Sequence, residues 1–218
     1  MAVLEARVAR ERDRAEKEAA RARAINTFLL DTLGSANPFE GRGRDTTVLE
    51  ALRLAAGKLE GAFPGQPDVE AGVRHTIGLT YLRLGRFEEA EPFLRSTVRL
   101  LTEHYGEDSP DLPEALVALG ILRQDRGDLV EAEALMRRSL AAARRQRTGP
   151  EPRQDEADIL ANLALVLQDR NEWDEAERIM REILANDRKV LGPDHVNLAI
   201  DLNNLGILLV RRGRSACS

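Results

Sequence analysis

Gly85-Arg86-Phe87-Glu88-Glu89-Ala90-Glu91 recurs as Gly127-Asp128-Leu129-Val130-Glu131-Ala132-Glu133 and as Asn171-Glu172-Trp173-Asp174-Glu175-Ala176-Glu177. The alanines are 42 and then 44 residues apart, and Gly213 follows Asn171 after a further 42 residues. A fixed period of this size is typical of a solenoid, in which each copy is one structural unit stacked on its neighbours. The usual work of a solenoid is to hold other molecules.

The composition favours soluble amphipathic helices. Of 218 residues, 43% are hydrophobic, 32% are charged and only 4% are aromatic, so we expect an all-α protein with almost no sheet. The net charge is -5, with acidic and basic residues interleaved, so no nucleic-acid partner is predicted. The apolar run at 25–33 is interrupted by polar residues and is too short to span a bilayer, which needs about 20 residues, so we expect no membrane contact.

The chain divides into four parts. Residues 1–45 predict a long charged helix, up to about residue 33, followed by a linker rich in glycine and proline. Residues 46–66 form an incomplete leading repeat, opened by a capping box of Thr47 and Glu50. Residues 67–213 contain three full repeats and a final A helix, and residues 214–218 form a frayed tail with the lone Cys217.

Each full repeat predicts an A helix followed by a B helix. The A helices are expected near 68–84, 110–126, 153–170 and 194–212, and the B helices near 87–104, 129–146 and 173–190. One residue after each A helix is expected to take a left-handed conformation, which glycine adopts freely and asparagine tolerates. These turn residues are Gly85, Gly127, Asn171 and Gly213.

Small residues recur where paired helices are expected to cross. They are Gly78, Gly120, Ala164 and Gly206 on the A helices, and Ala90, Ala132 and Ala176 on the B helices. Two helices approach closely only where neither carries a bulky side chain, so these positions predict the crossing points. The B helices also repeat a glutamate and arginine four residues apart, interpreted as a solvated pair that marks register.

The small residue on helix A and the alanine twelve positions later, as in Gly78 and Ala90, resemble the tetratricopeptide repeat (TPR). The 42-residue period, the turn Gly192-Pro193-Asp194-His195 and the following Leu202-Asn203-Asn204-Leu205 look like the repeats of kinesin light chains and many bacterial regulatory proteins. The resemblance covers residues 46–213. It implies a right-handed αα superhelix with the A helices lining its concave side.

A looser resemblance takes in the beginning of the chain. The order of a charged helix, Asn26–Asp31, Asn37-Pro38, Thr47–Leu52 and Gln66–Ala71 is similar to the region after the kinase domain and membrane span of bacterial serine/threonine kinases with TPR tails. No Gly-rich loop, His-Arg-Asp catalytic loop or Asp-Phe-Gly occurs here. The resemblance therefore implies a kinase as a neighbour in the parent protein, not an activity of this chain, and the compartment stays open.

The candidate binding residues lie on the expected concave face of the A helices. In the family, asparagines on this face bind the backbone of an extended peptide, because one amide both donates and accepts hydrogen bonds. Asn162 and Asn204 hold equivalent places in their repeats. The full set of predicted peptide-binding residues is His75, Arg83, Gln124, Asn162, Gln168, Asn203, Asn204 and Arg211.

Motifs for chemistry are weak. The three histidines have no partner at metal-ligand spacing within their own helices, and Gly41–Asp45 follows no strand and lacks the lysine of a nucleotide loop. We therefore predict no metal, no cofactor and no enzyme, and we expect a module that binds a protein or peptide ligand. The alternative is a self-associating scaffold, formed through helix 1–33 or through an uncapped last helix whose Leu202, Leu205, Leu208 and Leu209 lie open.

Overall fold

The computed structural model describes residues 12, 19–20, 22–25, 27–28, 48–147, 154–192 and 195–215. Within these parts every regular element is a helix and there is no strand, which confirms the all-α prediction. The predicted helix over 1–33, the linker up to residue 45 and the tail lie mostly or wholly outside the described residues. The elements are α2 Val48–Lys58, α3 Pro67–Arg83, α4 Phe87–Tyr105, the short 3₁₀ helix η2 Gly106–Asp108, α5 Leu112–Asp125, α6 Leu129–Gln146, α7 Gln154–Asp169, α8 Trp173–Leu191 and α9 Val196–Ser215.

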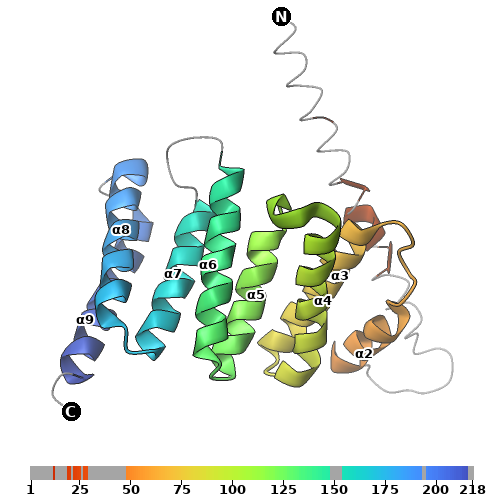
Figure 1. The fold of residues 1–218 in the computed structure, drawn as a ribbon, viewed down its shortest axis with the longest axis horizontal. Coiled ribbons are helices and arrows are strands. Elements are labelled where there is room, and N and C mark those ends of the chain that lie inside the picture. Colours follow the sequence, from red (N-terminus) through yellow and green to blue (C-terminus); the bar gives the residue numbers. More distant parts are fainter. Residues whose placement is uncertain are drawn as a thin grey trace, which may run out of the picture. The chain divides into compact units, whose positions relative to one another are not determined.

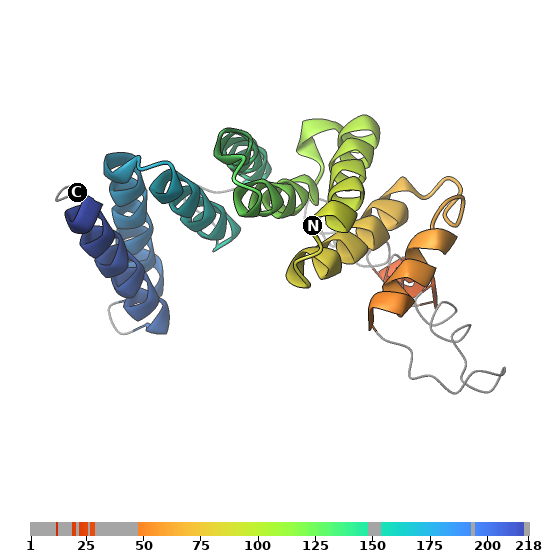
Figure 2. The same cartoon turned by 90° about the horizontal axis from the view of Figure 1, so that it is seen from below.

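The chain separates into two compact units, Met1–His104 and Tyr105–Ser218. The first contains α2, α3 and nearly all of α4, and the second contains η2 and α5 to α9. In the second unit each long helix packs against the next along the chain, as Figures 1 and 2 show from two directions. Helix α5 also contacts α7, so successive A helices lie on the same side of this unit.

The turn after each A helix has the same backbone geometry. Gly85, Gly127 and Asn171 have φ values of 68°, 83° and 62°, which confirms the left-handed prediction at these positions. In each turn the next residue donates its N–H to a carbonyl five residues earlier, at 2.8 to 2.9 Å, which closes the end of the A helix. Gly213 is different. It lies inside α9, which continues through Ser215, so the prediction of a turn there is wrong; no second helix follows α9 in the described residues to require a reversal.

The helix crossings explain the recurring glycines. A Cβ atom on Gly78 would lie 2.7 Å from Leu94 Cδ2, and one on Gly120 would lie 2.8 Å from Met136 Cε. Ala90, Ala132 and Ala176 on the B helices are completely buried. The predicted close approach is therefore confirmed at the α3–α4 and α5–α6 crossings, where the absent side chain makes room for a large apolar one.

One core runs through α6, α7, α8 and α9. Its members include Met136, Leu163 and, on α9, the fully buried Leu208, with Leu205 partly buried against it. The expectation that Leu205 and Leu208 lie on an open face is therefore wrong, since both are on the side of α9 that packs against the core. Leu202 and Leu209, on another side of α9, are exposed as expected.

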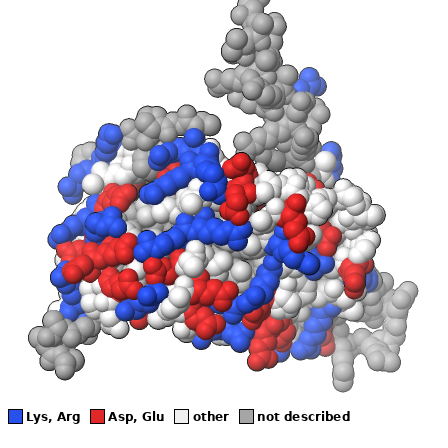
Figure 3. Space-filling view, in the orientation of Figure 1, with Lys and Arg blue, Asp and Glu red and all other residues white. Residues whose placement is uncertain are grey.

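The repeated glutamates on the B helices are less solvated than predicted. Glu133 binds Arg137 on its own helix at 2.8 Å, and it also binds Arg170 at the end of the next A helix at 2.6 Å. Glu177 likewise binds Arg181 at 2.7 Å and Arg212. Glu133 and Glu177 thus each link their own repeat to the following A helix. Arginine and acidic side chains mix over the visible face in Figure 3, with no large area of one sign.

Candidate functional site

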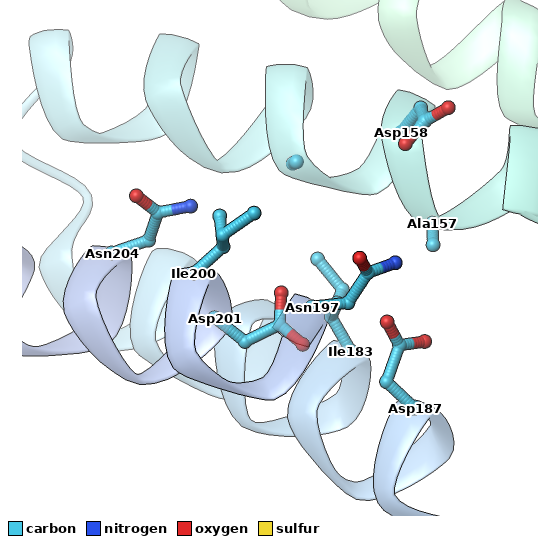
Figure 4. Close-up of a pocket in the computed structure, with 9 residues that line it drawn as sticks. Ala157, Asp158, Ile183, Asp187, Asn197, Ile200, Asp201 and Asn204 are labelled. Carbon is cyan, nitrogen blue, oxygen red and sulfur yellow. The ribbon is translucent and has the colours of Figure 1, made fainter. Parts of the chain in front are cut away.

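A cavity of about 180 Å³ lies between α7, α8 and α9. Helices α7 and α9, which are successive A helices, form its walls, and α8 closes it between them (Figure 4). Its lining combines small and apolar side chains with three carboxyl groups and two amides. The lining residues are Ala157, Asp158 and Ala161 from α7, Ile183 and Asp187 from α8, and Asn197, Ile200, Asp201 and Asn204 from α9.

Helical spacing brings these side chains together. On α9 the lining positions are 197, 200, 201 and 204, which fall on one face of a helix. The start of α9 is fixed by His195, whose ring Nδ1 accepts a hydrogen bond from the backbone N–H of Asn197 at 3.2 Å. His195 therefore acts as a helix cap beside the cavity.

Asp187 and Asp201 are the two less exposed of the three acids that line the cavity. Asp187 is only 4% exposed, and no hydrogen bond or ion pair connects it to any of the described residues. Atom Oδ2 of Asp201 is buried and has no hydrogen-bond partner in the described parts of the chain. Burial raises the pKa of Asp201 above its ordinary value, and the negative charge of Asp187 raises it further.

The sequence did not identify these two acids, although a signal was present. By repeat position Asp187 corresponds to Leu101 and Ala143, both buried in the core. Asp201 corresponds in the same way to the buried residues Val73, Ala115 and Ile159. A comparison of the repeats position by position would therefore have found two carboxyl groups where earlier repeats place core side chains.

Of the predicted amides, Asn204 lines the cavity and is half-buried. Asn162 is also half-buried but does not line the cavity, and its Nδ2 donates to the backbone oxygen of Asp158 at 2.8 Å. Asn203 is exposed and does not line the cavity, whereas Gln168 is 5% exposed and offers little surface to a ligand. The structure therefore brings only Asn204 of these four residues to the cavity.

The remaining predicted residues lie elsewhere. Gln124 on α5 donates from Nε2 to Oδ2 of Asp169 on α7 at 2.6 Å, which links two successive A helices. Arg211 is exposed on α9. His75 and Arg83 belong to α3 in the first unit, where Arg83 is exposed and the ring nitrogens of His75 are shielded from solvent.

Two properties of the described residues bear on the chemistry of this surface. None of their helices is long and apolar enough to cross a membrane. No group of three or more His, Cys, Asp or Glu side chains among them has the geometry to hold a metal ion, and this includes the three aspartates of the cavity.

Known proteins resemble this chain in fold. The tetratricopeptide repeat family model matches residues 70–145 and 155–216, more than half of the chain. One solved structure contains the TPR-like repeats, nearly identical to one another, of a Podosopora anserina protein described as a kinesin light chain. It is 20% identical in sequence to this chain, with a TM-score of 0.63 over 77% of this chain and 80% of that one. A variant form of the same repeats is 18% identical, with a TM-score of 0.64 over 77% of this chain and 79% of that one.

A third structure, BtubC (BKLC) from P. vanneervenii, is 19% identical to this chain. Its TM-score is 0.61, over 89% of this chain and 82% of that one. At these identities the structures bear on the fold alone. No curated protein sequence matches the chain.

Proposed function

We propose that this chain, which belongs to the tetratricopeptide repeat family, is a non-catalytic interaction module that binds a peptide or protein segment in a concave groove along its A helices. The observation that carries the proposal is the cavity between α7 and α9, because it lies between successive A helices and is lined at its base by the B helix α8. A binding surface built on rigid helices holds its side chains in fixed positions before the ligand arrives, which lowers the entropy lost on binding.

The side chains of this surface suit an extended segment. Asn197 and Asn204 offer amide groups, each able to donate to a carbonyl and accept from an N–H of a ligand backbone. Ile200 is 55% exposed, and Ala157 and Ala161 leave room beside it. Amides for the backbone and apolar surface for the side chains are the two features that peptide grooves combine.

We extend the proposed surface to the other A-helix residues identified from the sequence. In the second unit these are Asn162, Asn203, Gln124, Gln168 and Arg211, and in the first unit they are His75 and Arg83. Asn204 is the strongest of the set because it lines the cavity, whereas Gln168 is the weakest because it is buried.

Selection from a displayed random peptide library tests the groove. We expect the purified chain to enrich peptides that bind with measurable affinity by calorimetry. Asn204→Ala should weaken the best peptide by about 2- to 10-fold, the value of one neutral hydrogen bond. Asn186→Ala, an amide of α8 outside the cavity, is the control and should leave the affinity unchanged. Failure to enrich any binder would overturn the proposal.

We also propose that the module is the regulatory or sensing tail of a bacterial serine/threonine kinase. Support comes from the order of sequence features over residues 26–71, which is similar to the region that follows the kinase domain and membrane span in such proteins. Sequencing the gene around this segment tests it. A kinase domain encoded upstream in the same reading frame is expected, and a reading frame without one contradicts this part of the proposal.

A second candidate function is self-association through α9. Leu202, Gly206, Leu209 and Gly213 follow one another at spacings of four, three and four residues, which places them along one side of the helix. Leu202 is 50% and Leu209 41% exposed, and a Cβ atom on Gly206 would meet nothing within 4 Å. The corresponding Gly120 is covered by Met136. The occupant we propose is α9 of a second copy, because leucines and glycines alternating along one face complement themselves in an antiparallel pair.

Light scattering over a range of concentrations distinguishes the two routes to a dimer. If α9 is responsible, Leu209→Asp should give a monomer, whereas Leu165→Asp, at a 44% exposed position on α7, should not. If the charged segment is responsible, removal of residues 1–24 should abolish the dimer instead. A wild-type chain that is monomeric at all concentrations rules out self-association by either route.

A further inference from the structure

Two of the three carboxyl groups at the cavity lack a cation among the described residues. Asp187 is buried without a hydrogen bond or ion pair to them, and Asp201 has a buried oxygen atom with no hydrogen-bond partner in the same parts of the chain. The two groups share one cavity and repel each other when both are charged. An uncompensated carboxylate in a protein interior is strongly unfavourable, so the buried Asp187 beside the partly buried Asp201 requires an explanation.

Other buried carboxylates in the same unit have such partners. Glu177, 8% exposed, binds Arg181 and Arg212. Glu156, 1% exposed, has Oε2 3.3 Å from an Nη of Arg147, so its charge is compensated even though its Oε1 has no hydrogen-bond partner among the described residues. The unit therefore supplies arginines where a buried carboxylate serves the fold, and the described residues supply none at Asp187.

Repeat equivalence shows that the fold does not need acids at these places. The positions equivalent to Asp187 hold Leu101 and Ala143, and those equivalent to Asp201 hold Val73, Ala115 and Ile159. All five side chains are buried in the core. The same helix packing is thus achieved with apolar residues, and the two acids point to a group that comes from outside the chain.

The shape and chemistry of the cavity suit an arginine side chain. A volume of about 180 Å³ is well above the roughly 10–15 Å³ that one water molecule requires. Ile183 and Ile200 can contact the methylene groups of the side chain while the planar guanidinium, with five N–H donors, reaches both carboxylates. Lysine offers three donors on one nitrogen and fits two separate carboxylates less well.

We propose that the cavity between α7, α8 and α9 binds an arginine side chain of the partner segment, with Asp187 and Asp201 as its counter-charges. This inference rests on the proposed function and names the chemistry of the ligand at one point of the groove. Asp158 stands at the wall of the cavity and adds negative charge there, which favours approach of a basic segment. Asn204, on the same face of α9 as Asp201, lies beside the bound side chain and is placed to contact the backbone that carries it.

The direct test uses N-acetyl-arginine methylamide as the probe, titrated into isotope-labelled protein and followed by NMR. We expect saturable shift changes of the amide signals around Asp187 and Asp201, and no saturable change with the citrulline analogue, which has the same shape without the charge. Asp187→Asn and Asp201→Asn should each weaken binding by about tenfold or more, because a charge-assisted hydrogen bond is lost. Asp125→Asn, an exposed position on α5, is the matched control and should bind as the wild type does.

Equal binding of the citrulline analogue, or an Asp187→Asn/Asp201→Asn double variant that binds arginine normally, would overturn the inference. Loss of binding is not attributable to unfolding in these variants, because removal of an unpaired buried charge should maintain or raise the melting temperature, which is measured alongside. The peptide selection separates this inference from the proposed function. Binders that lack arginine and tolerate Asp187→Asn contradict the arginine site and leave the groove standing, whereas a selection without binders contradicts the groove itself.

Discussion

Glu177 and Asp187 lie ten residues apart on α8 and are similarly buried, at 8% and 4% exposure, yet their surroundings differ. Glu177 binds two arginines, one from its own helix and one from the next A helix. Asp187 has neither a hydrogen bond nor an ion pair within the described residues and faces a second acid across a cavity. Glu177 therefore belongs to the contacts that join successive repeats, whereas Asp187 belongs to the surface that we propose binds a ligand.

Removal of the paired acid should have the largest effect. Among the described residues, Glu177→Ala leaves Arg212 with Asp174 alone, at 2.7 Å, and leaves Arg181 without its helical partner, so the free energy of unfolding should fall by about 1–2 kcal/mol. The lower part of the usual range applies because the side chains of Arg181 and Arg212 are 63% and 42% exposed. Urea unfolding measures the change. The control is Glu182→Ala, whose 4.0 Å contact with Arg178 is exposed and should contribute only a few tenths of a kcal/mol. If Glu177→Ala lowers the free energy of unfolding no more than Glu182→Ala does, Glu177 does not stabilise the fold and the contrast with Asp187 is wrong.

Neutralising the unpaired acid should have the opposite sign. Asp187→Asn removes a buried charge that nothing in the described structure compensates, so we expect the free energy of unfolding to rise by about 1 kcal/mol. The same urea experiment applies, with Asp125→Asn expected to change stability by less than about 0.5 kcal/mol because it is exposed. Destabilisation by Asp187→Asn would mean that this carboxylate serves the fold after all.

The second acid of the cavity predicts a pH dependence. Burial and the charge of Asp187 raise the folded-state pKa of Asp201, so in the interval above its unfolded pKa of about 3.9 the folded state holds a proton more strongly than the unfolded state. Asp201 therefore opposes folding increasingly as pH rises through that interval, and its unfavourable contribution is constant above the raised pKa. Asp187 from α8 and Asp158 from α7 are the acids that line the cavity with it.

Stability curves of the wild type and Asp201→Asn between pH 3 and 7 measure this contribution. The advantage of Asp201→Asn should be smallest at the acid end, grow as pH rises and then level off. An advantage that shrinks as pH rises would show that Asp201 is stabilised, not destabilised, in its charged form.

The same comparison explains what the sequence could predict. Turn positions such as Gly127 and Asn171 and crossing positions such as Gly120 and Ala132 were identified because their causes are local and repeat at a fixed period. The role of Glu177 was underestimated, since the arginine that buries it is 35 residues away and only the pair within α8 follows from helical spacing. Its signal was the arginine that directly precedes three of the four predicted turn residues, at 126, 170 and 212.

The cavity was harder to predict because it joins three helices. Asn204 was identified by its place on the A helices, but Asp187 comes from a B helix, whose side chains were interpreted as packing or solvated surface. Asp187 and Asp201 are departures from the repeat, and a search for regularity passes over such positions. In a repeat protein the regular positions specify the fold, and the polar residues that replace core residues indicate where a particular copy has acquired another role.

The smallest effect is expected where a groove residue already has a partner. Gln124 lies among the predicted binding residues, but its amide donates to Asp169 at 2.6 Å between α5 and α7. Like Glu177, Gln124 has a partner in the next repeat, so its side chain contributes to the packing of the repeats. The hydrogen bond is exposed to solvent. Gln124→Ala should therefore lower stability by only about 0.5 kcal/mol and leave the affinity for N-acetyl-arginine methylamide unchanged. A double-mutant cycle with Asp169→Ala measures the pair. A loss of arginine binding in Gln124→Ala would show that a residue with a hydrogen-bond partner can still belong to the ligand site. The lack of a partner would then not be a valid reason to assign Asp187 and Asp201 to that site.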